Sequence, residues 1–134
     1  MATEPGPVKL ALADTSLFIA VEQERPLAGT PPEQIAVSIV TIAELRLGVL
    51  AADDGPTRAR RLESLTRADA LEPLPVDRSV AAAWAALLIA LRDAGKRMPL
   101  NDSWIAATAL AKGIPVVSQD ADYDEVPGLE VLRV

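Results

Sequence analysis

Short apolar runs alternate with longer segments of helical periodicity along almost the whole chain. The first run, 8–13, is interrupted only by Lys9 and is followed by the helical segment 17–21. A second run, 35–40, is rich in β-branched residues. Buried parallel strands have this near-continuous apolar character, and helices usually connect them. The alternation therefore predicts an α/β fold with a central, mainly parallel sheet that is flanked by helices.

Turn residues and helix caps set the remaining boundaries. Prolines and a glycine mark a loop at 26–32, Asp77 is a helix cap, and Gly95 and Gly113 are helix stops. The predicted helices are 17–21, 41–52, 56–70, 78–94 and 99–113. The predicted strands are 8–13, 35–40, 114–118 and 129–134, with 71–76 as a further short strand despite its two prolines.

The segment 78–94 is apolar nearly all round. A helix of that kind is buried, either in the core of its own domain or against another subunit. In the second case Trp84 and Leu88 would supply a dimer face. Plain core packing is the default interpretation.

Length and composition favour one domain. The chain has 134 residues, 50% of them hydrophobic, which suits one core and is too short for two domains of ordinary size. We expect a flexible extension at 1–7 and the domain at 8–134. The start lacks a basic region followed by an apolar stretch, and the longest apolar run, 80–91, is shorter than the roughly 20 residues of a membrane span. A cytoplasmic protein without a membrane anchor is expected.

Four acidic residues stand where a strand-like run gives way to a helix or turn, or within a turn of such a point: Asp14, Glu44, Asp102 and Asp120. In an open α/β sheet these points gather at one edge, so carboxylates that are distant in sequence can meet there. Each also has a local interpretation. Asp14 would cap a helix, Glu44 would form a capping box with Thr41, Asp102 would favour the first turn of its helix, and Asp120 would be a turn residue.

The chain has no His and no Cys. Imidazole bases, thiolate nucleophiles and soft-ligand zinc sites are therefore excluded, which leaves oxygen ligands and hard cations. Several carboxylates in one place repel each other, raise one another's pKa and destabilise the fold unless a cation compensates. Together these considerations favour a site for Mg²⁺ or Mn²⁺.

The net charge of −6 has the wrong sign for binding nucleic acid through overall charge. A nucleic-acid enzyme is still compatible with it, because a bound cation can be the largest charge in a site. The basic residues are clustered: four arginines share 58–67, and Lys96 and Arg97 lie just before Asp102. They form either solvated helix faces or phosphate contacts.

Four short motifs resemble those of PIN-domain nucleases, in the same order and over nearly the whole chain. They are LADTS at 12–16, TIAEL at 41–45, NDSWIAA at 101–107 and SQDADY at 118–123. Length and the cysteine-free single domain further resemble the VapC-type toxins of VapBC toxin-antitoxin pairs. The resemblance implies a PIN-like domain and a Mg²⁺- or Mn²⁺-dependent endoribonuclease acting on tRNA or rRNA. It also implies a homodimer, and a cognate VapB-type antitoxin whose C-terminal segment occupies the active-site groove.

Carried over position by position, the resemblance makes the four acids the catalytic core. Asp14 and Asp102 are the first candidates for direct metal contact. Glu44 and Asp120 would complete the metal's ligands or activate water, and Asp122 is an additional candidate ligand.

Further positions are implied around that core. Ser16 and Ser118 match small hydroxyl positions that orient ligands or waters, and Arg46, Lys96 and Arg97 are candidate RNA contacts. Two features depart from the family: the fourth motif has Ser118 and Tyr123 where the family often has Thr and Phe, and several residues precede the first strand. Neither departure removes a metal ligand, so both bear on substrate fit more than on activity.

Two other functions are open on the residues alone. A catalytically inert module that binds RNA or protein would be marked by a missing acid, and all four acids are present. A phosphoryl-transfer domain would favour paired acids, or Asp-x-Asp, after the first strand. Here Asp14 is followed by Thr15 and Ser16.

Overall fold

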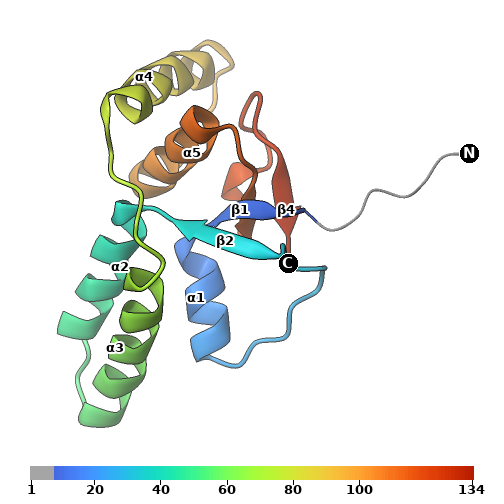
Figure 1. Cartoon of the computed structure of the whole chain (residues 1–134). Coiled ribbons are helices and arrows are strands. Elements are labelled where there is room, and N and C mark those ends of the chain that lie inside the picture. The colour runs from blue at the N-terminus through green and yellow to red at the C-terminus, as the bar shows by residue number, and fades with distance from the viewer. Residues whose placement is uncertain (1–7) are drawn as a thin grey trace, which may run out of the picture.

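Four parallel strands form the centre of the fold, in the order β2-β1-β3-β4 (Figure 1). The computed structural model describes residues 8–134, so the extension predicted at 1–7 lies outside the described residues. The prediction of an α/β fold with a parallel sheet is confirmed. The strands are β1 (Leu10–Ala13), β2 (Gln34–Val37), β3 (Val116–Ser118) and β4 (Val131–Arg133).

The strand order reverses between β1 and β3. From β1 the chain goes outward to β2 on one side, and β3 and β4 are added on the other side. The register pairs Ala13 with Val37 in β2 and with Val117 in β3, so the three strands end side by side. A crevice outside the carboxyl ends of strands at such a reversal is where α/β proteins bind ligands.

Helices cover both faces of the sheet (Figure 1). Three helices, α1 to α3, pack on one face, and α4 and α5 pack on the other with the 3₁₀ turn η1. They are α1 (Thr15–Glu22), α2 (Ile39–Leu50), α3 (Gly55–Asp69), α4 (Arg78–Asp93), α5 (Leu100–Lys112) and η1 (Ala121–Tyr123).

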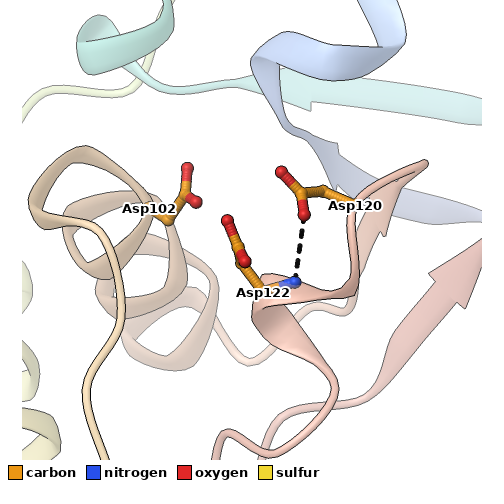
Figure 2. A group of neighbouring side chains, drawn as sticks. All are labelled: Asp102, Asp120 and Asp122. Carbon is orange, nitrogen blue, oxygen red and sulfur yellow. Dashed lines mark hydrogen bonds between the residues drawn. The ribbon is translucent and has the colours of Figure 1, made fainter.

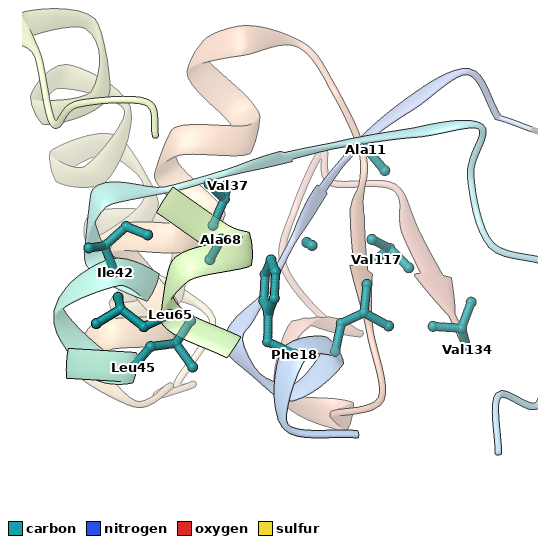
Figure 3. Close-up of a cluster of buried hydrophobic side chains, with 11 residues drawn as sticks. Ala11, Phe18, Val37, Ile42, Leu45, Leu65, Ala68, Val117 and Val134 are labelled. Carbon is teal, nitrogen blue, oxygen red and sulfur yellow. The ribbon is translucent and has the colours of Figure 1, made fainter. Parts of the chain in front are cut away.

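Side chains of β1 alternate between two cores because successive residues of a strand point to opposite faces. Ala11 and Ala13 belong to the cluster under α1 to α3, where Phe18 and Leu65 pack (Figure 3). Leu12 belongs to the cluster under α4 and α5. Burying both faces explains why the strands read as continuous apolar runs.

Two of the differences between the predicted and the observed strands have an identifiable physical cause. The strand predicted at 35–40 ends at Val37, because the Ser38 hydroxyl accepts the N–H of Val40 and starts α2 there. The strand predicted at 71–76 is wrong: within it only Leu74 forms a bridge, isolated and parallel, to Ser38. The prolines on either side of Leu74 lack the N–H that a ladder needs.

The default interpretation, that 78–94 packs wholly in the core of its own domain, is wrong, whereas burial of this helix against another subunit stays a prediction. In α4 only Val80, Leu87 and Leu91 are buried, whereas most of its alanines are exposed and Ile89 is 48% exposed. Trp84 faces inward, stacked on the second tryptophan of the chain. Small apolar side chains made the whole helix look like core. Among the helices of residues 8–134, none is long and apolar enough to cross a membrane.

Two arginines of the 58–67 cluster join α3 to α2. Arg58 donates to the carbonyl of Ala52 at 2.9 Å, and Arg61 donates to the carbonyl of Gly48 at 2.7 Å. The carbonyl of Gly48 lies in the last turn of α2 and that of Ala52 just after the helix, a region where unpaired acceptors attract cations. These two arginines therefore have a structural role.

Candidate active site

Asp14 lies directly after β1, at the position that would cap α1, but its side chain makes no capping hydrogen bond. The carboxylate is instead nearly buried, with the residue 3% exposed. The Ser16 hydroxyl donates to its Oδ1 at 2.6 Å and the Ser118 hydroxyl donates to its Oδ2 at 2.9 Å. The cap interpretation of Asp14 is therefore wrong, since both carboxylate oxygens are held by side chains at the edge of the sheet.

The same two hydroxyls also accept backbone N–H groups. Ser16 Oγ accepts from Gln119 at 3.1 Å, and Ser118 Oγ accepts from Asp120 at 2.8 Å. Each serine thus connects the turn after β3 to one oxygen of Asp14. This arrangement fixes the turn that carries Asp120 against the end of β1.

Three carboxylates converge beside this network (Figure 2). Asp102 comes from the first turn of α5, whereas Asp120 and Asp122 flank the start of η1. One oxygen from each of the three lies within 4.8 Å of the others. The N–H of Asp122 donates to Asp120 Oδ1 at 3.2 Å. Asp120 therefore stabilises the turn, as its local interpretation predicted, and also belongs to the acidic cluster.

The electrostatics of the cluster are those of crowded acids. Burial and, after it, the neighbouring Asp122 carboxyl raise the pKa of Asp102 to about 7, and the hydrogen bond from Tyr123 opposes this rise. Burial also raises the pKa of Asp14, against the lowering effect of its two serine hydrogen bonds. Ionising these groups therefore costs free energy in the absence of a cation.

Glu44 takes part in a separate contact at the same edge. The Thr15 hydroxyl donates to Glu44 Oε1 at 2.6 Å and lies 3.1 Å from Thr41 Oγ1. Because α2 begins at Ile39 with Ser38 as its cap, Thr41 is inside the helix. The capping box of Thr41 and Glu44 is therefore wrong, and Glu44 is oriented by the residue that follows Asp14.

Tyr123 is the site residue whose role the sequence did not reveal. Its side chain is fully buried, and its hydroxyl donates to Asp102 Oδ1 at 3.1 Å. Burial raises the pKa of this phenol, and the negative charges of Asp14, Asp102 and Glu44 raise it further. Tyr123 therefore lies among carboxylates from three different parts of the chain. The only signal in the sequence was a tyrosine where the resembling family often has phenylalanine.

Two of the three candidate RNA contacts lie next to one of the clustered acids. Lys96 and Arg97 line a pocket of about 390 Å³ together with Asp122. Lys96 also forms an ion pair with Glu125 at 3.2 Å. Arg46 is exposed on α2, two residues beyond Glu44.

A family model described as PIN domain matches residues 11–129, which include all four motifs. The chain belongs to the PIN-domain family. Ribonuclease VapC4 of Mycobacterium tuberculosis is 48% identical over 132 residues, covering 95% of this chain and 98% of that protein. Ribonuclease VapC5 of the same organism is 43% identical over 138 residues and covers 100% of both proteins.

Solved structures agree with this PIN-domain assignment. The chain matches the crystal structure of VapBC-5 from M. tuberculosis with a TM-score of 0.83 and 42% identity, covering 93% of this chain and 98% of that chain. It also matches FitAcB from Neisseria gonorrhoeae with a TM-score of 0.71 and 30% identity, covering 91% of this chain and 96% of that chain. The prediction of a PIN-like fold is therefore confirmed.

The donor set of this PIN domain fits a hard divalent cation. All the converging groups are carboxylates, the ligands that Mg²⁺ and Mn²⁺ prefer. Two ligands of one Mg²⁺ are at most about 4.2 Å apart, since each lies about 2.1 Å from the ion, so oxygens within 4.8 Å of one another need only a small closure. A cation would also offset the repulsion that raises the pKa of Asp102.

Proposed function

We propose that this PIN domain is a metal-dependent endoribonuclease and the toxin of a VapBC-type toxin-antitoxin pair. The observation that carries the proposal is the meeting of Asp102, Asp120 and Asp122 beside the buried Asp14. Relatives that are named ribonucleases and match along almost their full length support the activity. The ion could be Mg²⁺ or Mn²⁺.

Asp102, Asp120 and Asp122 would hold the cation, with Asp14 beside them as a further ligand. When bound, the cation supplies charge neutralisation at the phosphoryl oxygens and a lowered pKa for a coordinated water. Ser16 and Ser118 keep both oxygens of Asp14 in place. Since the chain has no His, the carboxylates of the site are our candidates for accepting the proton of the attacking water.

Glu44 is our candidate for this proton acceptor. The Thr15 hydroxyl fixes its Oε1, while Oε2 would be turned toward the water. Asp120 would share the role, as its N–H and side chain are both fixed by the turn. Lys96 and Arg97, on the rim next to Asp122, would contact the phosphates that flank the scissile bond.

The partners of the toxin follow from the same assignment. The structural match to a complex described as a toxin-antitoxin system supports a cognate VapB-type antitoxin. Its C-terminal segment would occupy the groove over the acids and exclude RNA. We further propose that the toxin is a homodimer, which the molecular mass of the purified protein in solution tests. Both tRNA and rRNA are candidate substrates.

Cleavage of RNA by the purified protein tests the proposal. We expect endonucleolytic products with Mg²⁺ or Mn²⁺ and none with EDTA, and Asp102→Asn should lose the activity. Asp54→Asn is the matched control, because Asp54 caps α3 outside the site and Asn caps as well. A small phosphate ester should not be hydrolysed.

Two results would count against this function. EDTA-resistant cleavage, or full activity of Asp102→Asn, rules out the proposed metal site. RNA binding without any cleavage in Mg²⁺ and Mn²⁺ would favour the inert module instead. Mapping the cleaved ends across total cellular RNA after brief expression distinguishes tRNA from rRNA.

A further inference from the structure

The three clustered carboxylates come from two separate parts of the fold. Asp102 belongs to α5, whereas Asp120 and Asp122 belong to the turn and η1 that follow β3. The Tyr123 hydroxyl donates to Asp102 Oδ1 at 3.1 Å and so joins these two parts. Electrostatic repulsion between the acids works against the same approach.

The ring of Tyr123 fixes the position of its hydroxyl. The side chain is fully buried in the cluster under α4 and α5, together with Leu12, Ile105 and Val116. A buried ring in a close-packed core has one rotamer. Core packing therefore already fixes the ring, and the hydrogen bond to Asp102 costs no further side-chain entropy. A tyrosine hydroxyl carries its proton at neutral pH, and here it donates that proton to Asp102 Oδ1.

We propose that Tyr123 is a positioning residue that orients the Asp102 carboxylate for divalent cation binding. The inference rests on the proposed function and deepens it. One O–H occupies one lone pair of Asp102 Oδ1, which leaves Oδ2 and the second lone pair of Oδ1 for the cation. A phenylalanine here would fill the core equally well but would leave the rotation of the carboxylate unrestrained.

Titration of the metal-free protein with Mn²⁺ tests the inference, followed by calorimetry and by the electron paramagnetic resonance signal of free Mn²⁺. We expect Tyr123→Phe to raise the Kd for Mn²⁺ about tenfold or more, as hydrogen bonds to metal ligands typically contribute that much. RNA cleavage by Tyr123→Phe should recover at saturating Mn²⁺. Thermal unfolding in EDTA checks that the variant is folded.

Thr108→Val is the matched control. Thr108 is a buried hydroxyl on the same helix as Asp102, and it donates to the carbonyl of Trp104 at 2.8 Å. Its loss should lower the melting temperature and leave the Kd for Mn²⁺ unchanged. A double variant separates positioning from a general structural effect: in the Asp102→Ala background, which lacks the acceptor, Tyr123→Phe should weaken Mn²⁺ binding no further, since the two residues act as one unit.

The outcomes separate this inference from the function on which it rests. Wild-type protein that neither binds Mn²⁺ nor cleaves RNA overturns both. Wild-type binding and cleavage together with an unchanged or lower Kd in Tyr123→Phe overturns the positioning role alone. An additive loss in the double variant also overturns it, because Tyr123 would then act independently of Asp102.

Discussion

Four aspartates at the starts of helices fall into two pairs with opposite electrostatics. Asp54 and Asp77 are exposed caps of α3 and α4, and each accepts the backbone N–H three residues ahead. These hydrogen bonds lower the pKa of both groups. Asp14 and Asp102 occupy comparable places at α1 and α5, yet burial raises the pKa of each.

The difference shows that position at a helix start does not decide what an aspartate does. Asp54 and Asp77 stabilise their helices through local contacts that any isolated helix could make. Asp14 and Asp102 are placed by contacts with distant segments, and they are held in a state that costs free energy when ionised. Sites that break local rules in this way are expected to be functional.

Replacing an acid of each pair should produce the largest contrast. Asp14→Asn should reduce the rate of RNA cleavage by more than the 10- to 100-fold that is typical of groups behind a metal ligand, because it removes a candidate ligand itself. Asp77→Asn should leave the rate unchanged, since Asn also caps helices. Initial rates on a defined RNA in Mg²⁺ measure both. Near-wild-type cleavage by Asp14→Asn would remove Asp14 from the catalytic core.

Loss of a serine hydroxyl should have the next largest effect. Ser118→Ala removes the donor to Asp14 Oδ2 and the acceptor for the N–H of Asp120, so cleavage should fall about 10- to 100-fold. Thr108→Val is the control, because Thr108 is equally buried but donates to the backbone carbonyl of Trp104. The idea fails if both variants lose the same small amount of activity, because that would indicate only a packing effect.

Much of this acidic edge was predictable from the sequence. Asp14 and Asp120 come directly after or close after apolar strands, and parallel strands end at a common edge. What could not be predicted is which oxygen faces which donor. The bond from Ser118 to Asp14 joins residues 104 positions apart, and no local pattern specifies such a rotamer.

The errors have a common physical origin as well. Thr41 and Glu44 have capping-box spacing, but Ser38 starts the helix three residues earlier and frees Glu44 for Thr15. The tyrosine at 123 was expected to bear on substrate fit, whereas in the structure its hydroxyl donates to Asp102. In both cases a tertiary contact determines the role of a residue whose local pattern pointed elsewhere.

The pH dependence of stability should also distinguish the two pairs. In the metal-free protein, Asp102 has a folded pKa of about 7 against 3.8 for the ordinary group. Its protonation favours the folded state, so this contribution is complete below about pH 3.8 and is lost as the pH rises to about 7. The melting temperature in EDTA should therefore fall from pH 5 to pH 8, and Asp102→Asn should reduce that fall.

Adding Mg²⁺ sharpens the same measurement. At pH 8 Asp102 is mostly ionised, so a bound cation should raise the melting temperature of the wild type by ligand linkage. At pH 5 the rise should be smaller, because protons compete with the metal for Asp102. Melting curves followed by circular dichroism give both values. A rise of equal size at the two pH values would show that the cation binds elsewhere.

The smallest effects belong to the caps. Asp54→Ala removes the acceptor for the N–H and hydroxyl of Thr57, so the melting temperature should drop slightly. Asp54→Asn should retain most of the stabilisation by the cap, because Asn also caps helices. The folded pKa of Asp54 is lowered below 3.8, so its contribution is present above about pH 3.8 and disappears as the pH falls through the folded value. The gap between wild type and Asp54→Ala should therefore narrow in acid, opposite in sign to the effect of Asp102. Melting curves at pH 3 and pH 6 measure it, and a gap that widened in acid would mean that Asp54 is stabilised in its protonated form, as the buried acids are.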